Sequence, residues 1–330
     1  MALTASQILL FPASISAIQQ HARGLLHAAS QFPGITSIFA TEQRGMMANI
    51  GLSLYFEAGD KVHQRSIVLA RFLDRVEERA VASRNTADTF IKEMIQYGYL
   101  SQSSGAGDKR IRPLVPTEKT MLAVLSWALE HLKTLDQLDG GDRANMVMRT
   151  PEVLAQLQPN IADDLVGKGS KEVATGTLAL FAWVNKSKLL FLRILASIKP
   201  FEGDASRHVT DIDSIAELAI WMNVSSTHLA RKLRDAETMG SLGWCGDRGQ
   251  SSMWISTGFM HEIAGEYAAR LARPTRSCAL FQTRLCGGVG WCHHDPIFRT
   301  GAPAWDRQSQ HGGWFHHGIV QVQLHPDGSG

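Results

Sequence analysis

Residues 83–100 read SRNTADTFIKEMIQYGYL, and their polar and apolar side chains separate onto two faces of one predicted helix. Apolar residues recur at spacings of three and four, which is typical of a core-facing stripe: Ala87, Phe90, Ile91, Met94 and Ile95. The opposite face carries short polar groups and cations: Arg84, Asn85, Asp88, Thr89 and Lys92. Such groups can reach base edges or phosphates, although any solvated amphipathic helix has a similar outer face. The helix alone therefore does not decide between DNA contact and solvent.

The segment after this helix adds a basic hairpin. Ser83 is placed to cap the helix, and Gly98 to end it in a left-handed conformation. Strand-like residues then flank SSGAGD, at 99–102 and 110–115, and the returning strand carries three cations: Lys109, Arg110 and Arg112. A basic hairpin beside a polar helix can contact the phosphate backbone while the helix enters the major groove.

The same order of predicted elements occurs a second time. A shift of 142 residues places Ser83 on Ser225 and Gly98 on Gly240, and a shift of 140 places Thr117 on Thr257. The second helix exposes Ser226, Thr227, Arg231 and Arg234, and the second hairpin carries Arg248 in GDRGQ. Two copies in one chain could pack as a pseudo-twofold pair, as two subunits do in a homodimer.

Apolar periodicity predicts a mainly α fold with small β-hairpins. Helices are predicted over 13–30, 41–57, 66–79, 84–97 and 118–136, and again over 178–198, 211–222, 226–239 and 258–272. The residues between these sets, about 140–170, contain glycines and prolines and are predicted to be loop-rich. We expect an N-terminal helical arm (1–40), a first unit (41–140), a linker (141–177), a second unit (178–272) and a tail (273–330).

One run of the chain resembles a known family. ASRNTADTFIKEMIQYGYL, followed by DKRIRPLVPTEK and a long helix, resembles the winged helix-turn-helix of MarR-like bacterial transcriptional regulators. The resemblance covers about 41–138 and, more loosely, 178–272; the helix pair is joined through AVAS where the family has a short Gly-containing turn. It implies a tandem winged helix-turn-helix protein that binds a pseudo-palindromic operator.

The resemblance also implies roles for particular residues. The first helix would place these residues in the major groove: Arg84, Asn85, Asp88, Thr89 and Lys92. The first wing would contact the flanking minor groove or phosphates through Lys109, Arg110 and Arg112. Analogous roles in the second unit fall to Ser226, Thr227, Arg231, Arg234 and Arg248.

The charge of the chain limits how strongly it attracts DNA. The formal net charge is +2, with 33 basic and 31 acidic side chains, so any nucleic-acid contact must come from local patches. Over 84–112 the cations exceed the carboxylates by two, and over 225–254 by one. Electrostatic affinity would then be modest and quickly lost with salt. A winged-helix module that binds another protein and not DNA is the alternative.

The remaining sequence signals point away from membranes and metals. The most apolar stretch, 178–198, contains Asn185, Lys186, Lys188 and Arg193, which favours a buried domain helix over a membrane span. The tail gathers Cys286, Cys292, His293 and His294 without the spacing of a zinc knuckle. A metal-sensing regulator that uses this tail is a further alternative, but from about 276 onward we expect mainly disorder.

Together these observations predict a cytoplasmic bacterial DNA-binding regulator. Its partner would be double-stranded DNA, and it would be a monomer with an internal pseudo-dimer or a homodimer, without a membrane anchor. No phosphate loop, dinucleotide fingerprint or nucleophile elbow is present, so we expect no catalysis, metal or cofactor. A cavity between the helical arms could hold a small-molecule effector, for which the sequence indicates no chemistry.

Overall fold

The computed structural model describes most of the first 285 residues. The described ranges are 3–32, 41–58, 65–102, 113–150, 153–166, 176–181, 186–199 and 206–285, with side chains to residue 273 except at 156 and 164–166. Residues Met1–Phe281 form one compact unit, to which the following description applies. The expectations about the first wing tip and the Cys/His-rich tail lie outside the described residues.

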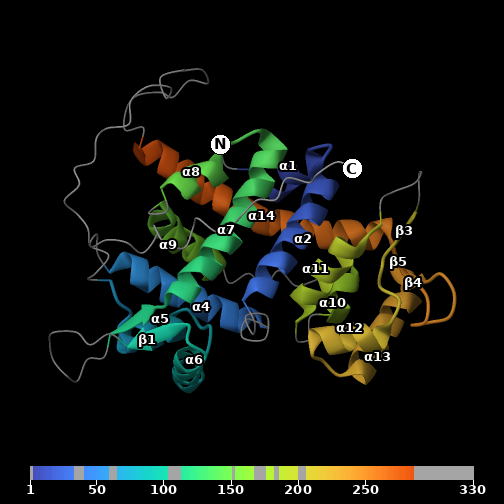
Figure 1. The fold of residues 1–330 in the computed structure, drawn as a ribbon, viewed down its shortest axis with the longest axis horizontal. Coiled ribbons are helices and arrows are strands. Elements are labelled where there is room, and N and C mark those ends of the chain that lie inside the picture. The colour runs from blue at the N-terminus through green and yellow to red at the C-terminus, as the bar shows by residue number, and fades with distance from the viewer. Residues whose placement is uncertain are drawn as a thin grey trace, which may run out of the picture. The chain divides into compact units, whose positions relative to one another are not determined.

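The described residues form thirteen helices and five short strands (Figure 1). The helices are α1 (Ala5–Leu10), α2 (Ser14–Gln31), α4 (Glu42–Glu57), α5 (Leu69–Glu78), α6 (Arg84–Gln96), α7 (Glu118–Asp139), α8 (Arg143–Arg149), α9 (Val153–Val166), α10 (Gly176–Phe181), α11 (Ser187–Ser197), α12 (Ile215–Met222), α13 (Ser226–Thr238) and α14 (Thr257–Leu285). The strands are β1 (Leu100–Gln102), β2 (Leu114–Pro116), β3 (Arg207–Val209), β4 (Leu242–Trp244) and β5 (Met253–Ser256). The predicted class, mainly α with small antiparallel sheets, is confirmed.

The prediction of a loop-rich stretch over 140–170 is wrong, because this stretch holds α8 and α9. Pro159 lies inside α9, where a proline costs about 3 kcal/mol. The helix persists because it packs against α4, and its buried apolar side chains recur at helical spacing: Val153, Leu154, Leu157 and Ile161. Burial of such side chains contributes about 1.5–3 kcal/mol each, which outweighs the proline.

Two further boundaries differ from expectation. The single helix predicted over 178–198 is two helices, α10 and α11, and Lys186 before α11 has a left-handed backbone with φ of 71°. The helix predicted from 211 begins only at Ile215, and β3 precedes it. Strand β3 is stabilised by pairing with β5, a contact between residues about fifty positions apart. Local periodicity does not report such a contact.

The order of elements recurs within the chain. The first series is α4, α5, α6, β1, β2 and α7, and the second is α11, β3, α12, α13, β4, β5 and α14, with β3 as an additional strand. In the second series β5 lies between β3 and β4. In the first series β2 pairs with β1 and also forms an isolated antiparallel bridge from Leu114 to Ile67, just before α5. Both series thus contain the predicted order of two helices, a hairpin and a helix. In both, the second strand of the hairpin also pairs with residues that precede the helix pair.

Left-handed residues end both helices of each helix pair. Ala80 (φ 50°) follows α5 and Asn223 (φ 52°) follows α12, while Gly98 (φ 71°) and Gly240 (φ 70°) follow α6 and α13. The four turns share one hydrogen-bond pattern, in which the next residue's N–H reaches back five positions: Val81 to Val76, Val224 to Ala219, Tyr99 to Met94, and Ser241 to Ala236. This is the Schellman termination of a helix. The AVAS joint therefore makes the kind of turn that glycine usually makes, with alanine in the left-handed position.

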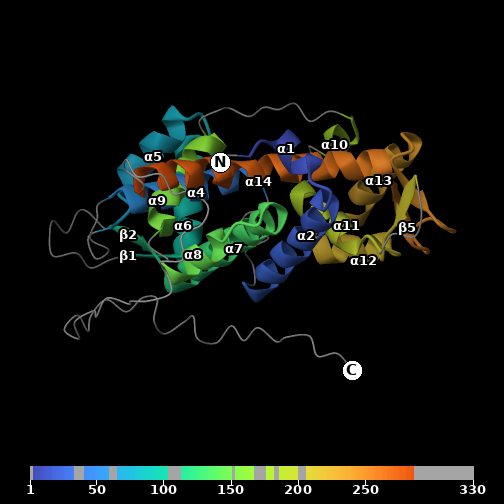
Figure 2. The same cartoon turned by 90° about the horizontal axis from the view of Figure 1, so that it is seen from above.

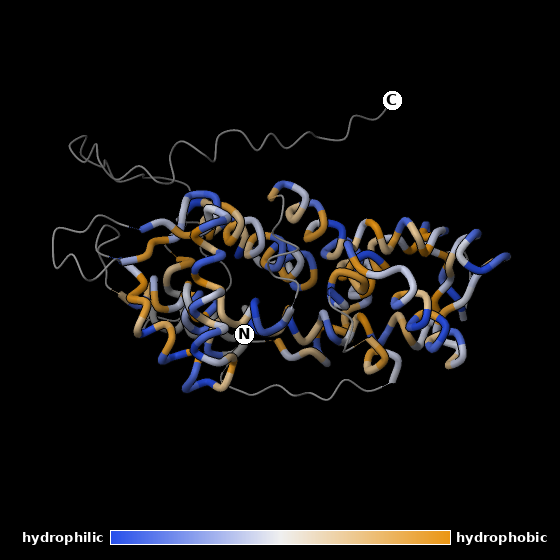
Figure 3. The backbone as a smooth tube through the Cα atoms, turned by 90° about the horizontal axis from the view of Figure 1, so that it is seen from below, coloured by the Kyte–Doolittle hydropathy of each residue, from blue (hydrophilic) through white to orange (hydrophobic). Residues whose placement is uncertain are grey.

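Helices α2 and α9, which precede the first and second series, each pack against a helix of the other series. Helix α2 packs against α7 and α11, and α9 packs against α4 (Figures 1 and 2). Buried residues of α1 and α2, such as Ile8 and Ile18, belong to the same hydrophobic core as α11–α14. The side chains of α4–α6 form a separate core, and hydrophobic segments alternate with hydrophilic ones along the helices (Figure 3). No described helix is long and apolar enough to cross a membrane.

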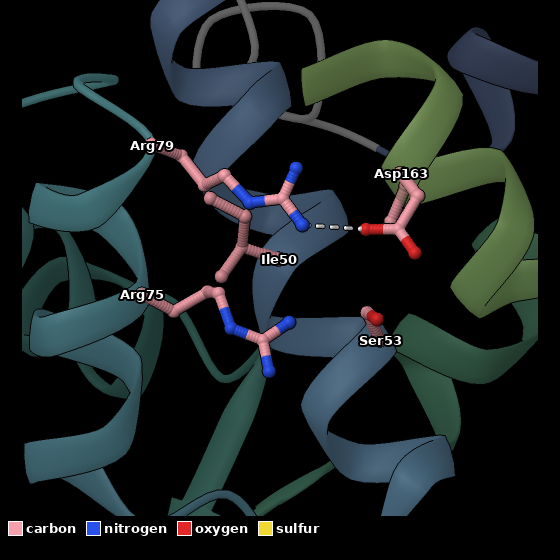
Figure 4. A pocket seen from close by; sticks show the side chains of 6 residues that line it. Ile50, Ser53, Arg75, Arg79 and Asp163 are labelled. Carbon is pink, nitrogen blue, oxygen red and sulfur yellow. Dashed lines mark hydrogen bonds and ion pairs between the residues drawn. The ribbon is translucent and has the colours of Figure 1, made fainter. Parts of the chain in front are cut away.

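An ion pair connects α9 with the turn after α5. The Arg79 guanidinium lies 3.0 Å from the Asp163 carboxylate, and the two side chains point toward one another beside Ile50 and Ser53 of α4 (Figure 4). Arg75 lines the same small pocket. Because both partners are partly exposed, such a pair contributes less than about 1 kcal/mol. Its main consequence is to orient α9 beside the α4–α5 corner.

Two histidines are buried between α2 and α7. Their ring centroids are 4.5 Å apart, and His21 Nδ1 lies 3.0 Å from the Thr134 hydroxyl oxygen, whereas His21 Nε2 is buried without a partner. Burial lowers the pKa of His21 to about 4, despite the Glu130 carbonyl. Burial also lowers the pKa of His131 well below its ordinary value, and the neighbouring His21 lowers it further. Both rings are therefore neutral at pH 7.

We expect the free energy of unfolding to decrease as the pH falls from about 6.5 to about 4. In this window the unfolded chain binds a proton at His21 that the folded protein does not bind, since the pKa of His21 is about 4 in the folded protein and the ordinary pKa of histidine is 6.5. The loss due to His21 alone would be about 3 kcal/mol. Urea unfolding followed by circular dichroism at several pH values measures it. His21→Leu should flatten the dependence, and His27→Leu, at an exposed histidine, should leave it unchanged. An equal slope in wild type and His21→Leu would contradict this.

Replacing Ala80 by glycine should stabilise the protein by about 1 kcal/mol. A left-handed backbone costs an L-residue with a Cβ about 1–2 kcal/mol, partly offset by the larger entropy of glycine in the unfolded chain. Ala80 is exposed, so no packing is lost. Urea unfolding measures the gain, and Asn223→Gly is the matched control with a smaller expected gain, because asparagine tolerates this conformation. A destabilised Ala80→Gly variant would refute the explanation.

Candidate nucleic-acid interface

The outer face of α6 is exposed, but its cations lie beside carboxylates. The Ser83 hydroxyl caps the helix by accepting from the Thr86 N–H, and Asn85 and Thr89 are exposed on the face that begins there. Arg84 lies 2.6 Å from Asp74 and 3.6 Å from Glu77 of α5. Lys92 lies 2.6 Å from Asp88, one turn earlier on α6. Each cation on this face is therefore largely neutralised before any partner arrives.

The first wing lies only partly within the described residues. Strands β1 and β2 pair antiparallel, with Leu100 opposite Pro116. The three cations assigned to the tip of this wing lie outside the described residues: Lys109, Arg110 and Arg112. Their contribution stays a prediction from the sequence.

The outer face of α13 carries two arginines that form no ion pair with a carboxylate of the described residues. Ser225 caps the helix, and Ser226, Thr227, Arg231 and Arg234 are all exposed. Arg231 donates to His228 Nδ1 at 3.1 Å. Within the described part of the chain, no carboxylate lies within ion-pair distance of Arg231 or Arg234. The positive potential is therefore less compensated on α13 than on α6, although the sequence favoured the first unit.

Arg248 of the second hairpin points back toward α13. Its Nε donates to the Glu237 carboxylate and a terminal nitrogen donates to the Ala230 carbonyl, each at 2.7 Å. Both side chains of the ion pair are mostly buried, with 31% and 21% exposed. The structure thus gives Arg248 a role that the sequence did not indicate, as a link that holds the β4–β5 turn against α13.

A cation that the sequence did not single out lies on the outer face of the three-stranded sheet. The Arg207 guanidinium lies 4.1 Å from the ring centroid of Trp254, on the neighbouring strand. The Trp254 ring covers Gly243 so closely that a Cβ there would lie 2.4 Å from it. Arg207 was missed because no strand was predicted before α12. It adds a positive charge held by an aromatic ring to the second wing.

Apolar side chains are exposed near the second helix pair. Ile220 is 78% exposed and Trp221 46% exposed on α12, and Met239 at the end of α13 is 52% exposed. Exposed aliphatic and aromatic side chains close together are typical of protein-contact surfaces. These exposed apolar side chains are the feature expected of the alternative, a module that binds another protein and not DNA.

Apart from Arg248 in the β4–β5 turn, the described residues of the predicted site lie on two helices, α6 and α13, each the second helix of a pair joined by a left-handed turn. Comparisons of the chain with protein-family models, with curated proteins and with solved structures gave no match.

Proposed function

We propose that the chain is a sequence-specific DNA-binding transcriptional regulator with two winged helix-turn-helix units in tandem, of the kind found in MarR-like regulators. The observation that carries this proposal is the exposed pair Arg231 and Arg234 on α13, the second helix after a left-handed turn. The recurrence of the same turn and the same order of elements around α6 supports a second, related face.

In this proposal α13 enters the major groove. Ser226 and Thr227 are at its N-terminus, where short hydroxyl side chains can contact phosphates or bases. Arg231 and Arg234 are three residues apart, so they lie on one face of the helix and can contact the backbone and guanine edges. Arg207 on the wing would reach the neighbouring phosphates, and Arg248 would hold the wing in place.

The first unit would contribute less electrostatic affinity. Arg84 and Lys92 would have to exchange a carboxylate for a phosphate, with little net gain in free energy. Asn85 and Thr89 remain exposed and neutral, which suits hydrogen bonding to base edges. The second unit then supplies more of the phosphate attraction and the first unit supplies more of the base contacts.

A second candidate function is a protein-interaction module with the same fold. The exposed Ile220 and Trp221 favour it, as do the paired cations of α6. On this alternative α12 would be covered by another protein and the α13 arginines would stay in solvent.

The double variant Arg231→Ala/Arg234→Ala should bind a random-sequence DNA duplex more weakly than wild type. Each lost phosphate contact lowers the slope of log affinity against log salt by about one, so the slope should fall by about two. Fluorescence anisotropy of labelled duplex across a salt series measures it. The control Lys133→Ala/Arg149→Ala removes two exposed cations of α7 and α8 and should retain the wild-type slope.

An unchanged slope in the α13 variant would mean that the proposed face is wrong. Absence of DNA binding by the wild type at low salt would favour the protein-interaction module. Circular dichroism should show that both double variants remain folded, since none of the four side chains is buried.

A further inference from the structure

A large cavity lies among α2, α4, α7, α11 and α14, away from the outer faces of α6 and α13. Its volume is about 890 Å³. Ligand sites in proteins commonly enclose about 300–1,000 Å³. The cavity is thus of a size that accepts a small organic molecule.

Most of the wall is apolar. Several aliphatic and aromatic side chains that line the cavity are only partly covered by protein: Met46, Leu52, Val124, Trp127, Leu189 and Leu192. They come from α4, α7 and α11, so the apolar wall extends over three helices. A ligand that removed their apolar surface from water would be stabilised by the hydrophobic effect.

The charged lining residues come mainly from α11 and α14. Among the described residues, four cationic side chains line the cavity, Lys186, Lys188, Arg270 and Arg273, against two carboxylates, Glu42 and Glu266. Arg270 is compensated by Glu266 at 2.7 Å, whereas Lys188 Nζ is 3.6 Å from Glu42, which is longer than a hydrogen bond. The cations among these lining residues outnumber the carboxylates. Lys186 Nζ donates to the Met222 carbonyl at 2.7 Å, and the carboxylate beside Lys188 is farther away than the one beside Arg270.

The N-terminus of α11 adds positive potential to the part of the cavity that Lys188 lines. Lys186 in the N-cap position makes no side-chain cap hydrogen bond, and Ser187 and Lys188 begin the helix and line the cavity. The first N–H groups of a helix have no acceptor within the helix and carry a partial positive charge. Burial lowers the pKa of Lys188 to about 8, so its ammonium is still mostly charged at pH 7.

We propose that this cavity binds a mainly apolar small molecule with one anionic group, such as a medium-chain carboxylate. The apolar body would lie against α4 and α7, and the carboxylate would lie beside Lys188 and the N-terminus of α11. The proposal does not depend on DNA binding, and it is tested without DNA.

Calorimetric titration with decanoate, decanol and decyltrimethylammonium tests both parts of the proposal. These probes share one apolar chain and differ in charge. Wild type should bind decanoate at least about tenfold more tightly than the ammonium probe, with decanol between them. Lys188→Met keeps the apolar stem, so it should weaken decanoate about tenfold and leave decanol unchanged. Lys133→Met, at an exposed lysine outside the cavity, is the matched control.

A second variant tests whether the ligand occupies the cavity itself. Val124→Trp adds bulk to the wall and should weaken all the probes that bind wild type. Thermal unfolding by circular dichroism establishes that each variant is folded before titration. The proposal is overturned if wild type binds none of the probes, if the ammonium probe binds as tightly as decanoate, or if folded Lys188→Met retains wild-type affinity for decanoate.

Discussion

Four left-handed residues set the direction of the chain at the ends of the paired helices. Ala80 and Asn223 turn the chain between the two helices of each pair, and Gly98 and Gly240 turn it from the second helix into a strand. Because each turn reaches back five residues to a helix carbonyl, the direction of the next element is set locally. The outer faces of α6 and α13 are presented to solvent only because these turns place their apolar stripes against the core.

The packing of the two series explains why the cavity lies where it does. Helix α2 packs on α7 of the first series and on α11 of the second, and α9 packs on α4 of the first, so the helices that precede the two series connect them. The cavity is lined from both series, by α4 and α7 on one side and by α11 and α14 on the other. The proposed ligand would therefore contact both halves of the chain at once.

Periodicity predicted the elements whose stability is local, and missed those that depend on distant partners. Helix α6 has a serine cap, an apolar stripe and a terminal glycine, and its predicted and observed ends agree within one residue. Helix α9 contains a proline and is held by α4, while β3 is held by β5, so neither has a sufficient local signal.

Prediction of the candidate site from the sequence was limited in the same way, because contacts between elements have no local signal. The exposed positions of α6 and α13 follow from helical spacing alone. The carboxylates beside Arg84 come from α5, and the partners of Arg248 come from α13. The Lys92–Asp88 pair lies within α6 and could be read from its spacing of four residues, whereas the contacts of Arg84 and Arg248 join different elements and do not follow from a count of charges along one helix.

Contact of α13 and its wing with DNA can be measured by amide hydrogen exchange of the chain with and without a random-sequence duplex. We expect slower exchange on DNA binding in the first turn of α13, at Ser226–His228, and in the turn between β4 and β5, with no change in α8. Unchanged exchange in both segments at saturating DNA, or protection confined to segments other than α6, α13 and the wings, would show that α13 and its wing do not contact DNA.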